Sequence, residues 1–195
     1  MSARRPYVAN IDFPAFYAPA FGGNEALSRE FYAALTDRTA KIIIHQAARM
    51  LWLSDQIDEV ARGRPALQIL FFIIAAEAVS KLQADFEGEG QSRFHVRRFF
   101  LELCSDELRS RLAPAFQSNG SWLTPTEAVD LLYDLRCDVA HRGQYYNLHL
   151  PRPESDESHQ FVTWKGKQLI AFIPATQLRQ IVLEGAVLAA KRRTP

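Results

Sequence analysis

The most constraining feature of this sequence is an apolar segment in the first half of the chain. Over residues 66–79 the only polar side chains are Gln68 and Glu77. The run is shorter than the ~20 residues that span a bilayer. Apolar side chains occupy most of a helical circumference over residues 65–86, and a helix with this pattern must be covered by other elements. The sequence therefore predicts a mainly α fold with this segment as a buried central helix.

The length and composition fit a single domain. The chain has 195 residues, of which 48% are hydrophobic and 23% are charged, close to globular averages. Residues 1–22 predict an extended arm that packs its aromatic side chains on another surface, such as a partner subunit. Those side chains are Tyr7, Phe13, Phe16 and Tyr17. Residues 23–195 contain no internal repeat, so they predict one helical domain.

Local signals divide this domain into a helical bundle of about five to seven helices. Residues 24–61 carry a helical pattern that stops at Gly63, which indicates one long helix or two in tandem. Residues 92–103 and a short helix that begins at Ser105 predict a helical pair with one basic face.

The C-terminal part predicts a small hairpin and a last helix. Residues 151–159 form a polar, acidic loop, and two strand-like segments then flank the turn Lys165-Gly166-Lys167. This pattern predicts a β-hairpin over about residues 160–173. Thr176 is expected to cap a final amphipathic helix over about residues 176–193.

The best-defined helix begins at Thr124-Pro125-Thr126-Glu127. This segment combines an N-cap residue, a first-turn proline and a capping-box glutamate. One apolar stripe follows at spacings of four, three and four residues: Ala128, Leu132, Leu135 and Val139. Gly143 is placed to end the helix.

Charge and cysteine content exclude several classes of protein. The net charge of +1 lacks the strongly basic signature of a protein that coats nucleic acid, although it allows a local basic patch. Cys104 and Cys137 form no CxxC pair and no zinc-type cluster, which favours a reducing cytoplasm and no bound metal.

The N-terminal segment has no signal-peptide core, and we find no glycine-rich phosphate loop and no nucleophile elbow. We therefore expect a cytoplasmic protein without a cofactor.

Residues 131–143 carry the strongest functional motif. Arg136 and His141 have four residues between them, at the end of the helix that starts at Thr124. The segment resembles the signature of the HEPN superfamily, small helical domains that include many metal-independent endoribonucleases. Tyr133-Asp134-Leu135 before the motif and Arg142-Gly143 after it are similar to Apea-like branches of the superfamily.

The helix context selects this pair, because spacing alone does not. Three other Arg and His pairs have six residues between them: Arg38 with His45, Arg142 with His149, and Arg152 with His159. The first pair is expected in mid-helix, and the others lie in or beside a proline-bearing loop. Only the pair formed by Arg136 and His141 lies on a capped, striped helix.

A second resemblance to the superfamily concerns Glu77 and Lys81, an acid one turn before a base on the buried helix. The alternative for these two residues is an i,i+4 ion pair on a partly exposed edge. For Arg136 and His141 the alternative is favourable interaction with the C-terminal end of the helix dipole.

The resemblance implies a homodimer in which both motifs line one cleft. Five residues along an ideal helix separate two side chains by about 140°, so Arg136 and His141 do not share a face of one helix. Either the helix frays before Gly143, or the Arg136 side chain folds along the surface, or the pair meets its copy across the dimer, as the resemblance implies. We expect His141 to relay a proton during attack of an RNA 2′-hydroxyl on the adjacent phosphate, and Arg136 to hold the phosphorane. Asp138 is expected to orient His141 or the 2′-hydroxyl. Flanking phosphates are expected to contact Arg142, Arg97 and Arg98.

Two other functions stay open at this point. Cys137 follows the motif arginine where active members usually carry a polar residue, which favours a module that binds RNA or a nucleotide without cleaving it. A helical scaffold or antitoxin-like partner is the third possibility, with the N-terminal arm and residues 151–159 as its docking surface. A role in growth control or phage defence, with a cognate antitoxin or another partner protein, is implied by the resemblance alone.

Overall fold

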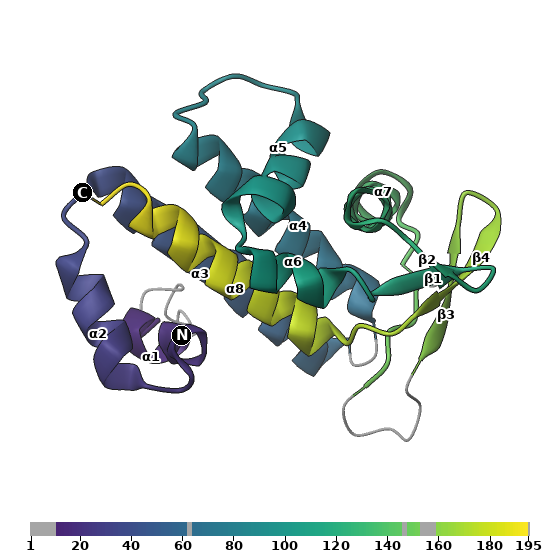
Figure 1. Ribbon diagram of the computed structural model, residues 1–195, viewed down its shortest axis with the longest axis horizontal. Coiled ribbons are helices and arrows are strands. Elements are labelled where there is room, and N and C mark those ends of the chain that lie inside the picture. Colours follow the sequence, from purple (N-terminus) through teal and green to yellow (C-terminus); the bar gives the residue numbers. More distant parts are fainter. Residues whose placement is uncertain (1–10, 62–63, 146–147, 153–158, 195) are drawn as a thin grey trace, which may run out of the picture.

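The computed structural model describes residues 11–61, 64–145, 148–152 and 159–194. In this part of the chain, eight α-helices and a small antiparallel sheet confirm the mainly α prediction (Figure 1). The helices are α1 (Phe13–Tyr17), α2 (Glu25–Ala34), α3 (Arg38–Val60), α4 (Pro65–Gln83), α5 (Ser92–Arg98), α6 (Asp106–Leu112), α7 (Pro125–Arg142) and α8 (Ala175–Lys191). A 3₁₀ turn (Ala18–Phe21) follows α1, and a π-helical turn (Phe99–Leu103) follows α5.

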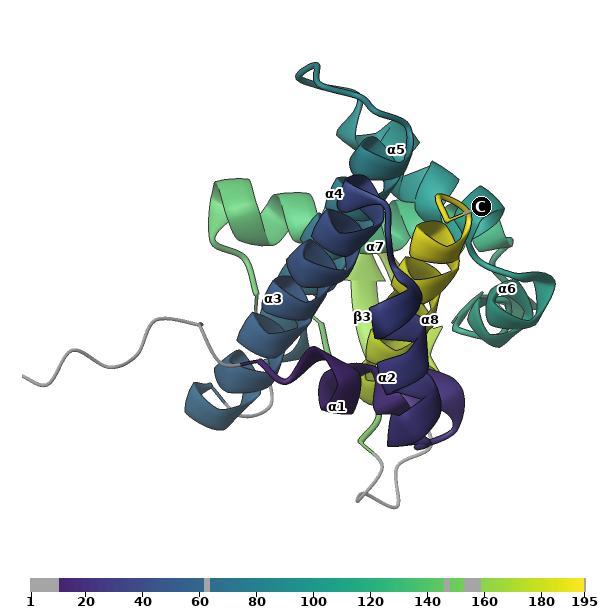
Figure 2. The same ribbon diagram turned by 90° about the vertical axis from the view of Figure 1, so that its left-hand side faces the viewer.

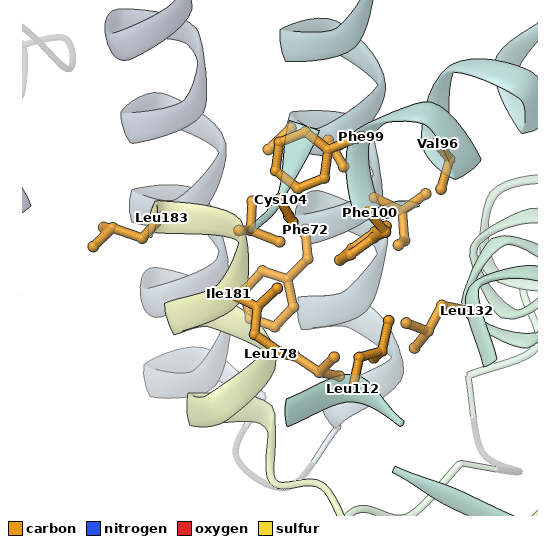
Figure 3. Packing of buried hydrophobic residues seen from close by; sticks show 14 of the residues in the cluster. Phe72, Val96, Phe99, Phe100, Cys104, Leu112, Leu132, Leu178, Ile181 and Leu183 are labelled. Carbon is orange, nitrogen blue, oxygen red and sulfur yellow. The ribbon is translucent and has the colours of Figure 1, made fainter. Parts of the chain in front are cut away.

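Helix α4 is the centre of the bundle, as its apolar pattern predicts. It packs against α3, α5, α7 and α8 (Figures 1 and 2). Figure 3 shows side chains from these parts of the chain meeting in the core, among them Phe72, Phe100, Leu132 and Leu178, which are all buried. By length and composition α4 is also the one helix in the described part of the chain that can cross a membrane, with a mean hydropathy of 1.6. Its place inside the bundle accounts for that composition.

The segment 24–61 forms two helices in tandem, because two side chains cap separate starts. Asn24 accepts a hydrogen bond from the backbone of Leu27 at 3.1 Å and begins α2. Asp37 accepts one from the backbone of Ala40 at 2.7 Å and begins α3. The chain therefore stops and restarts between the two caps.

The prediction of an extended arm is wrong for residues 11–22. Asp12 caps α1, and the Tyr17 side chain is buried. The Tyr17 hydroxyl donates a 2.8 Å hydrogen bond to the backbone carbonyl of Ile44 in α3. This segment thus folds back on its own chain because Tyr17 finds both apolar cover and an acceptor there. Tyr7 lies outside the described residues.

The predicted hairpin is confirmed as part of a larger sheet. Strands β3 (Gln160–Trp164) and β4 (Lys167–Ala171) pair around the lysine-rich turn, and the strand order is β2-β1-β4-β3. No sequence pattern predicts β1 (Phe116–Ser118) or β2 (Ser121–Trp122), because both are too short to show a period. The sheet lies at one end of the bundle, beside α7 (Figure 1).

The start of the last helix differs slightly from the prediction. Helix α8 begins at Ala175, and Pro174 occupies the N-cap position without a side-chain hydrogen bond. Thr176 is therefore a residue of the first turn and not the cap. Pro174 itself is still extended, with φ −73° and ψ 155°, so the helical backbone starts at the residue after it.

Candidate functional site

Helix α7, which carries the motif, has a capped start and a glycine end. The hydroxyl of Thr124 accepts from the backbone of Glu127, whose carboxylate accepts in turn from the backbone of Thr124, so the predicted capping box is present. Gly143 ends the helix with a left-handed φ of 63°, which glycine adopts without strain. Of the predicted stripe, Ala128, Leu132 and Leu135 are buried and Val139 is partly buried.

Arg136 turns inward, toward α4. Its Nη2 lies 3.6 Å from Oε2 of Glu77, and the two side chains are only 19% and 12% exposed. Its Nη1 lies 3.9 Å from the sulfur of Cys137, and its buried Nε has no hydrogen-bond acceptor within the described part of the chain. The guanidinium is thus held by one carboxylate at a distance longer than a hydrogen bond, with donor capacity left over.

Glu77 is the centre of a small charged cluster. Its carboxylate accepts from Nζ of Lys81 and from Oγ of Ser92, both at 2.7 Å. Burial alone raises the pKa of Glu77, but the hydrogen bonds from Lys81 and Ser92 and the positive charges of Lys81 and Arg136 outweigh it, so this pKa lies below its ordinary value. The structure therefore brings three predicted site residues together: Glu77, Lys81 and Arg136.

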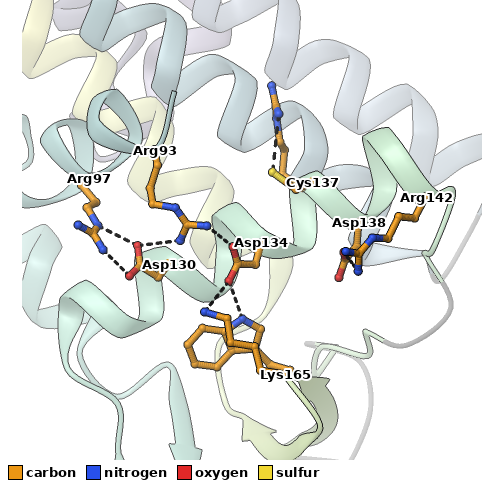
Figure 4. Close-up of polar contacts among 10 residues, drawn as sticks. Arg93, Arg97, Asp130, Asp134, Cys137, Asp138, Arg142 and Lys165 are labelled. Atoms are coloured by element: carbon orange, nitrogen blue, oxygen red, sulfur yellow. Dashed lines mark hydrogen bonds and ion pairs between the residues drawn. The ribbon is translucent and has the colours of Figure 1, made fainter. Parts of the chain in front are cut away.

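His141 is not part of this cluster. It lies exposed in the last turn of α7, where it makes no hydrogen bond or ion pair with residues that the structure describes. Asp138 does not orient it, because the Asp138 carboxylate pairs with Arg142 at 3.1 Å (Figure 4). Within one chain, Arg136 and His141 therefore point to different surroundings, as their separation along the helix requires.

The predicted phosphate contacts of α5 are already engaged by protein groups. Nε and Nη2 of Arg97 donate to the two carboxylate oxygens of Asp130 at 2.8 and 2.6 Å. Arg98 donates to the backbone carbonyl of Ser80 at 2.8 Å and to Gln83. A bidentate carboxylate leaves little of the guanidinium fork for phosphate. Arg97 and Arg98 therefore join α5 to its neighbours instead of forming a free basic face.

Sequence reasoning missed the network that joins α5, α7 and the hairpin. Arg93 pairs with Asp134 of α7 and lies 3.3 Å from Asp130 (Figure 4). Asp134 also accepts from the indole nitrogen of Trp164 at 2.9 Å and from Lys165 at 3.1 Å. The part of this network between α5 and α7 has a sequence pattern. Arg93 and Arg97 on α5, and Asp130 and Asp134 on α7, are each four residues apart, so each pair lies on one face of its helix.

This network predicts a pH-dependent stability. The hydrogen bond from Arg97 holds the pKa of Asp130 below its ordinary value, and for Asp134 the bonds from Trp164 and Arg93 outweigh the effect of burial. A depressed pKa in the folded state contributes stability above the unfolded value of about 3.9, and this contribution is lost as pH falls through the folded pKa.

We therefore expect the urea midpoint of the wild-type protein to fall between pH 5 and pH 3, and Asp134→Asn to reduce this fall. The exposed carboxylate of Glu30 supplies the control, because Glu30→Gln is expected to keep the wild-type pH dependence. Equal pH dependence in both variants would show that Asp134 does not carry the effect.

The alternative pair of Arg38 and His45 does not form a second site. Arg38 is the first residue of α3, and His45 lies two turns later with its Nε2 2.7 Å from the hydroxyl of Tyr32. The His45 ring also stacks on Phe13, with the ring centroids 4.2 Å apart. His45 thus serves to hold α1 and α2 against α3. Among the described residues, no group of three or more His, Cys, Asp or Glu side chains is placed to hold a metal ion.

The chain matches no protein-family model, no curated protein and no solved structure.

Proposed function

We propose that this protein is a metal-independent endoribonuclease of the HEPN type, active as a homodimer in the cytoplasm. One observation carries the proposal. The motif arginine is anchored by a buried acid of the central helix, while the motif histidine stands exposed on the last turn of the same capped helix. A fixed cation and an accessible imidazole are the two groups that metal-free phosphodiester cleavage needs.

A second copy of the chain supplies the missing half of each site. Arg136 and His141 diverge by about 140° on α7, so one chain does not aim both groups at one phosphate. In a twofold dimer, residue i of one copy meets residue j of the other and the reverse, which creates two equivalent sites. Each site then combines Arg136 of one protomer with His141 of its partner.

The chemistry balances without a metal or an external reagent. The RNA 2′-oxygen attacks the adjacent phosphorus while His141 takes its proton, and Arg136 donates to the oxygens of the phosphorane that forms. The bond from phosphorus to the 5′-oxygen then breaks, and the imidazolium returns a proton to that oxygen. The products are a 2′,3′-cyclic phosphate and a 5′-hydroxyl. Arg142, whose side chain is 68% exposed, holds a flanking phosphate in this scheme.

A second candidate is an RNA-binding module that does not cleave. The observation in its favour is that Cys137, and not a polar oxygen or nitrogen, follows the motif arginine and lies 3.9 Å from Nη1 of Arg136. In this case the anchored Arg136 contacts phosphate, but no reaction follows. The cellular role as a toxin or in phage defence, with a partner such as an antitoxin, belongs to the proposal as well.

The decisive test incubates purified protein with end-labelled single-stranded RNA in EDTA. Expected are fragments that end in a cyclic phosphate and begin with a 5′-hydroxyl, from a protein that sediments as a dimer. Binding without fragments would replace the proposal by the non-catalytic module. Activity that EDTA abolishes would contradict the mechanism.

A further inference from the structure

The outer face of the sheet carries an unusual set of exposed rings. In the pairing register, Trp122 of β2, Gln117 of β1, Ile170 of β4 and Phe161 of β3 stand opposite one another in a single row. Paired residues of antiparallel strands point to the same side. Trp122 is 50% exposed and Phe161 is 52% exposed, two of the few large apolar side chains that remain so open.

Two further rings extend this row. The centroids of Phe172 and Trp122 lie 4.9 Å apart, and the His159 ring lies 5.7 Å from Phe172 and 6.1 Å from Phe161. We call the surface of Trp122, His159, Phe161 and Phe172 the aromatic face. The opposite side of the sheet belongs to the core, where Phe116, Val162, Leu169 and Ala171 are buried. The fold therefore does not need the aromatic face for its own packing.

The area and width of this face distinguish between a second copy of the chain and a short run of nucleic acid as its binding partner. The strands have two, three, five and five residues, and at about 3.3 Å per residue and about 4.8 Å between strands they present roughly 240 Å² on one side. A second copy on this face would bury roughly 480 Å² in total, well below the ~1,200–2,000 Å² of a stable interface. The distance from Trp122 to Phe161 is three strand spacings, or about 14 Å, which suits a short run of bases.

The chemistry of the face also suits nucleic acid. Of the described side chains that point outward here, none carries a carboxylate, and the neutral ones include the amides of Gln117 and Gln168. Lys167 pairs in register with Trp164 on the core side of the sheet, and Lys165 forms an ion pair with Asp134, so neither lysine belongs to this face. Rings stack on bases of any sequence, and amides bond to base edges.

We infer that the aromatic face binds single-stranded RNA by base stacking and so delivers substrate to the site on α7. This inference rests on the proposed function, since it names how that function takes hold of RNA. The stacking residues are Trp122 and Phe161, with Phe172 and His159 beside them. The same hairpin contacts Asp134 of the motif helix through Lys165 and through Trp164, which lies on the other side of the sheet from the aromatic face.

The test measures the anisotropy of a short fluorescent single-stranded RNA, with His141→Ala in every protein so that no cleavage occurs. Trp122→Leu keeps apolar bulk but removes the ring face, and it is expected to weaken binding at least about fivefold. Trp122→Phe keeps a ring and is expected to retain most of the affinity. Phe94 on α5, 54% exposed, gives the matched control Phe94→Leu, which is expected to bind like the parent protein.

Phe161→Leu repeats the test at the other end of the row, in case Trp122→Leu does not fold. Equal binding by all variants would overturn the inference, as would a Trp122→Leu protein whose oligomeric state changes, because the face would then join copies of the chain. If the wild-type protein cleaves RNA but its affinity for RNA does not depend on Trp122, the inference is wrong and the proposed function stands. If the affinity depends on Trp122 but the wild-type protein does not cleave RNA, the inference stands and the proposed nuclease activity is wrong. If the wild-type protein does not bind RNA, both are wrong.

Discussion

Replacing His141 by alanine is expected to lower RNA cleavage by about 10²- to 10⁴-fold, the usual contribution of a positioned acid and base. The urea midpoint is expected to stay at the wild-type value, because His141 is exposed and makes no contact that the fold depends on. His149 is also exposed but lies outside the motif, so His149→Ala is the matched control and is expected to cleave normally. Wild-type cleavage by His141→Ala would exclude this residue from the reaction.

Mixing two inactive variants tests whether the site is shared between protomers. In a dimer of Arg136→Ala with His141→Ala, one composite site loses both groups and the other keeps both. Random exchange of subunits is then expected to restore about a quarter of wild-type activity, since half the dimers are mixed and each has one intact site. If each chain forms its own site, the mixture has no intact site and stays inactive.

Replacing Glu77 by alanine is expected to cause the largest loss of stability among the charged residues, about 3 kcal/mol. The reason is that Lys81 and Arg136, 25% and 19% exposed, lose their shared carboxylate and remain as neighbouring positive charges with little water around them. Urea unfolding measures the change. Glu77→Gln keeps the acceptor for Ser92 and is expected to lose less.

The control for this prediction is an ion pair of the same i,i+4 spacing that is open to water. Glu25 and Arg29 form such a pair, with side chains 52% and 63% exposed. Glu25→Ala is expected to change stability by at most about 0.5 kcal/mol, because water and salt screen an exposed pair. Similar losses for Glu77→Ala and Glu25→Ala would show that the cluster around Glu77 adds nothing beyond a surface ion pair.

Local signals made the main helices predictable from the sequence. The apolar circumference of α4 and the cap, stripe and glycine of α7 are all encoded within a few neighbouring residues. The parts that could not be predicted depend on distant residues. Tyr17 makes the N-terminal segment fold back through a bond to Ile44, and β1 exists because β4, more than fifty residues later, pairs with it.

Some residues of the candidate site could also be predicted from local patterns, and others could not. The motif identified Arg136 and His141, and the spacing of Glu77 and Lys81 indicated their ion pair, because both are local patterns. The sequence could not show that Arg97 is bound by Asp130, since that contact depends on how α5 crosses α7. A guanidinium that a carboxylate binds through two hydrogen bonds has little of its fork left for phosphate.

The contacts of Asp134 connect the motif helix to α5 and to the hairpin. Its single carboxylate is held by Arg93 of α5 and by Trp164 and Lys165 of the hairpin, so three elements share one anchor. The hairpin cannot move away from the bundle without breaking those bonds, two residues before Arg136. We therefore expect the amide hydrogens of β3, β4 and the second half of α7 to exchange as one cooperative unit.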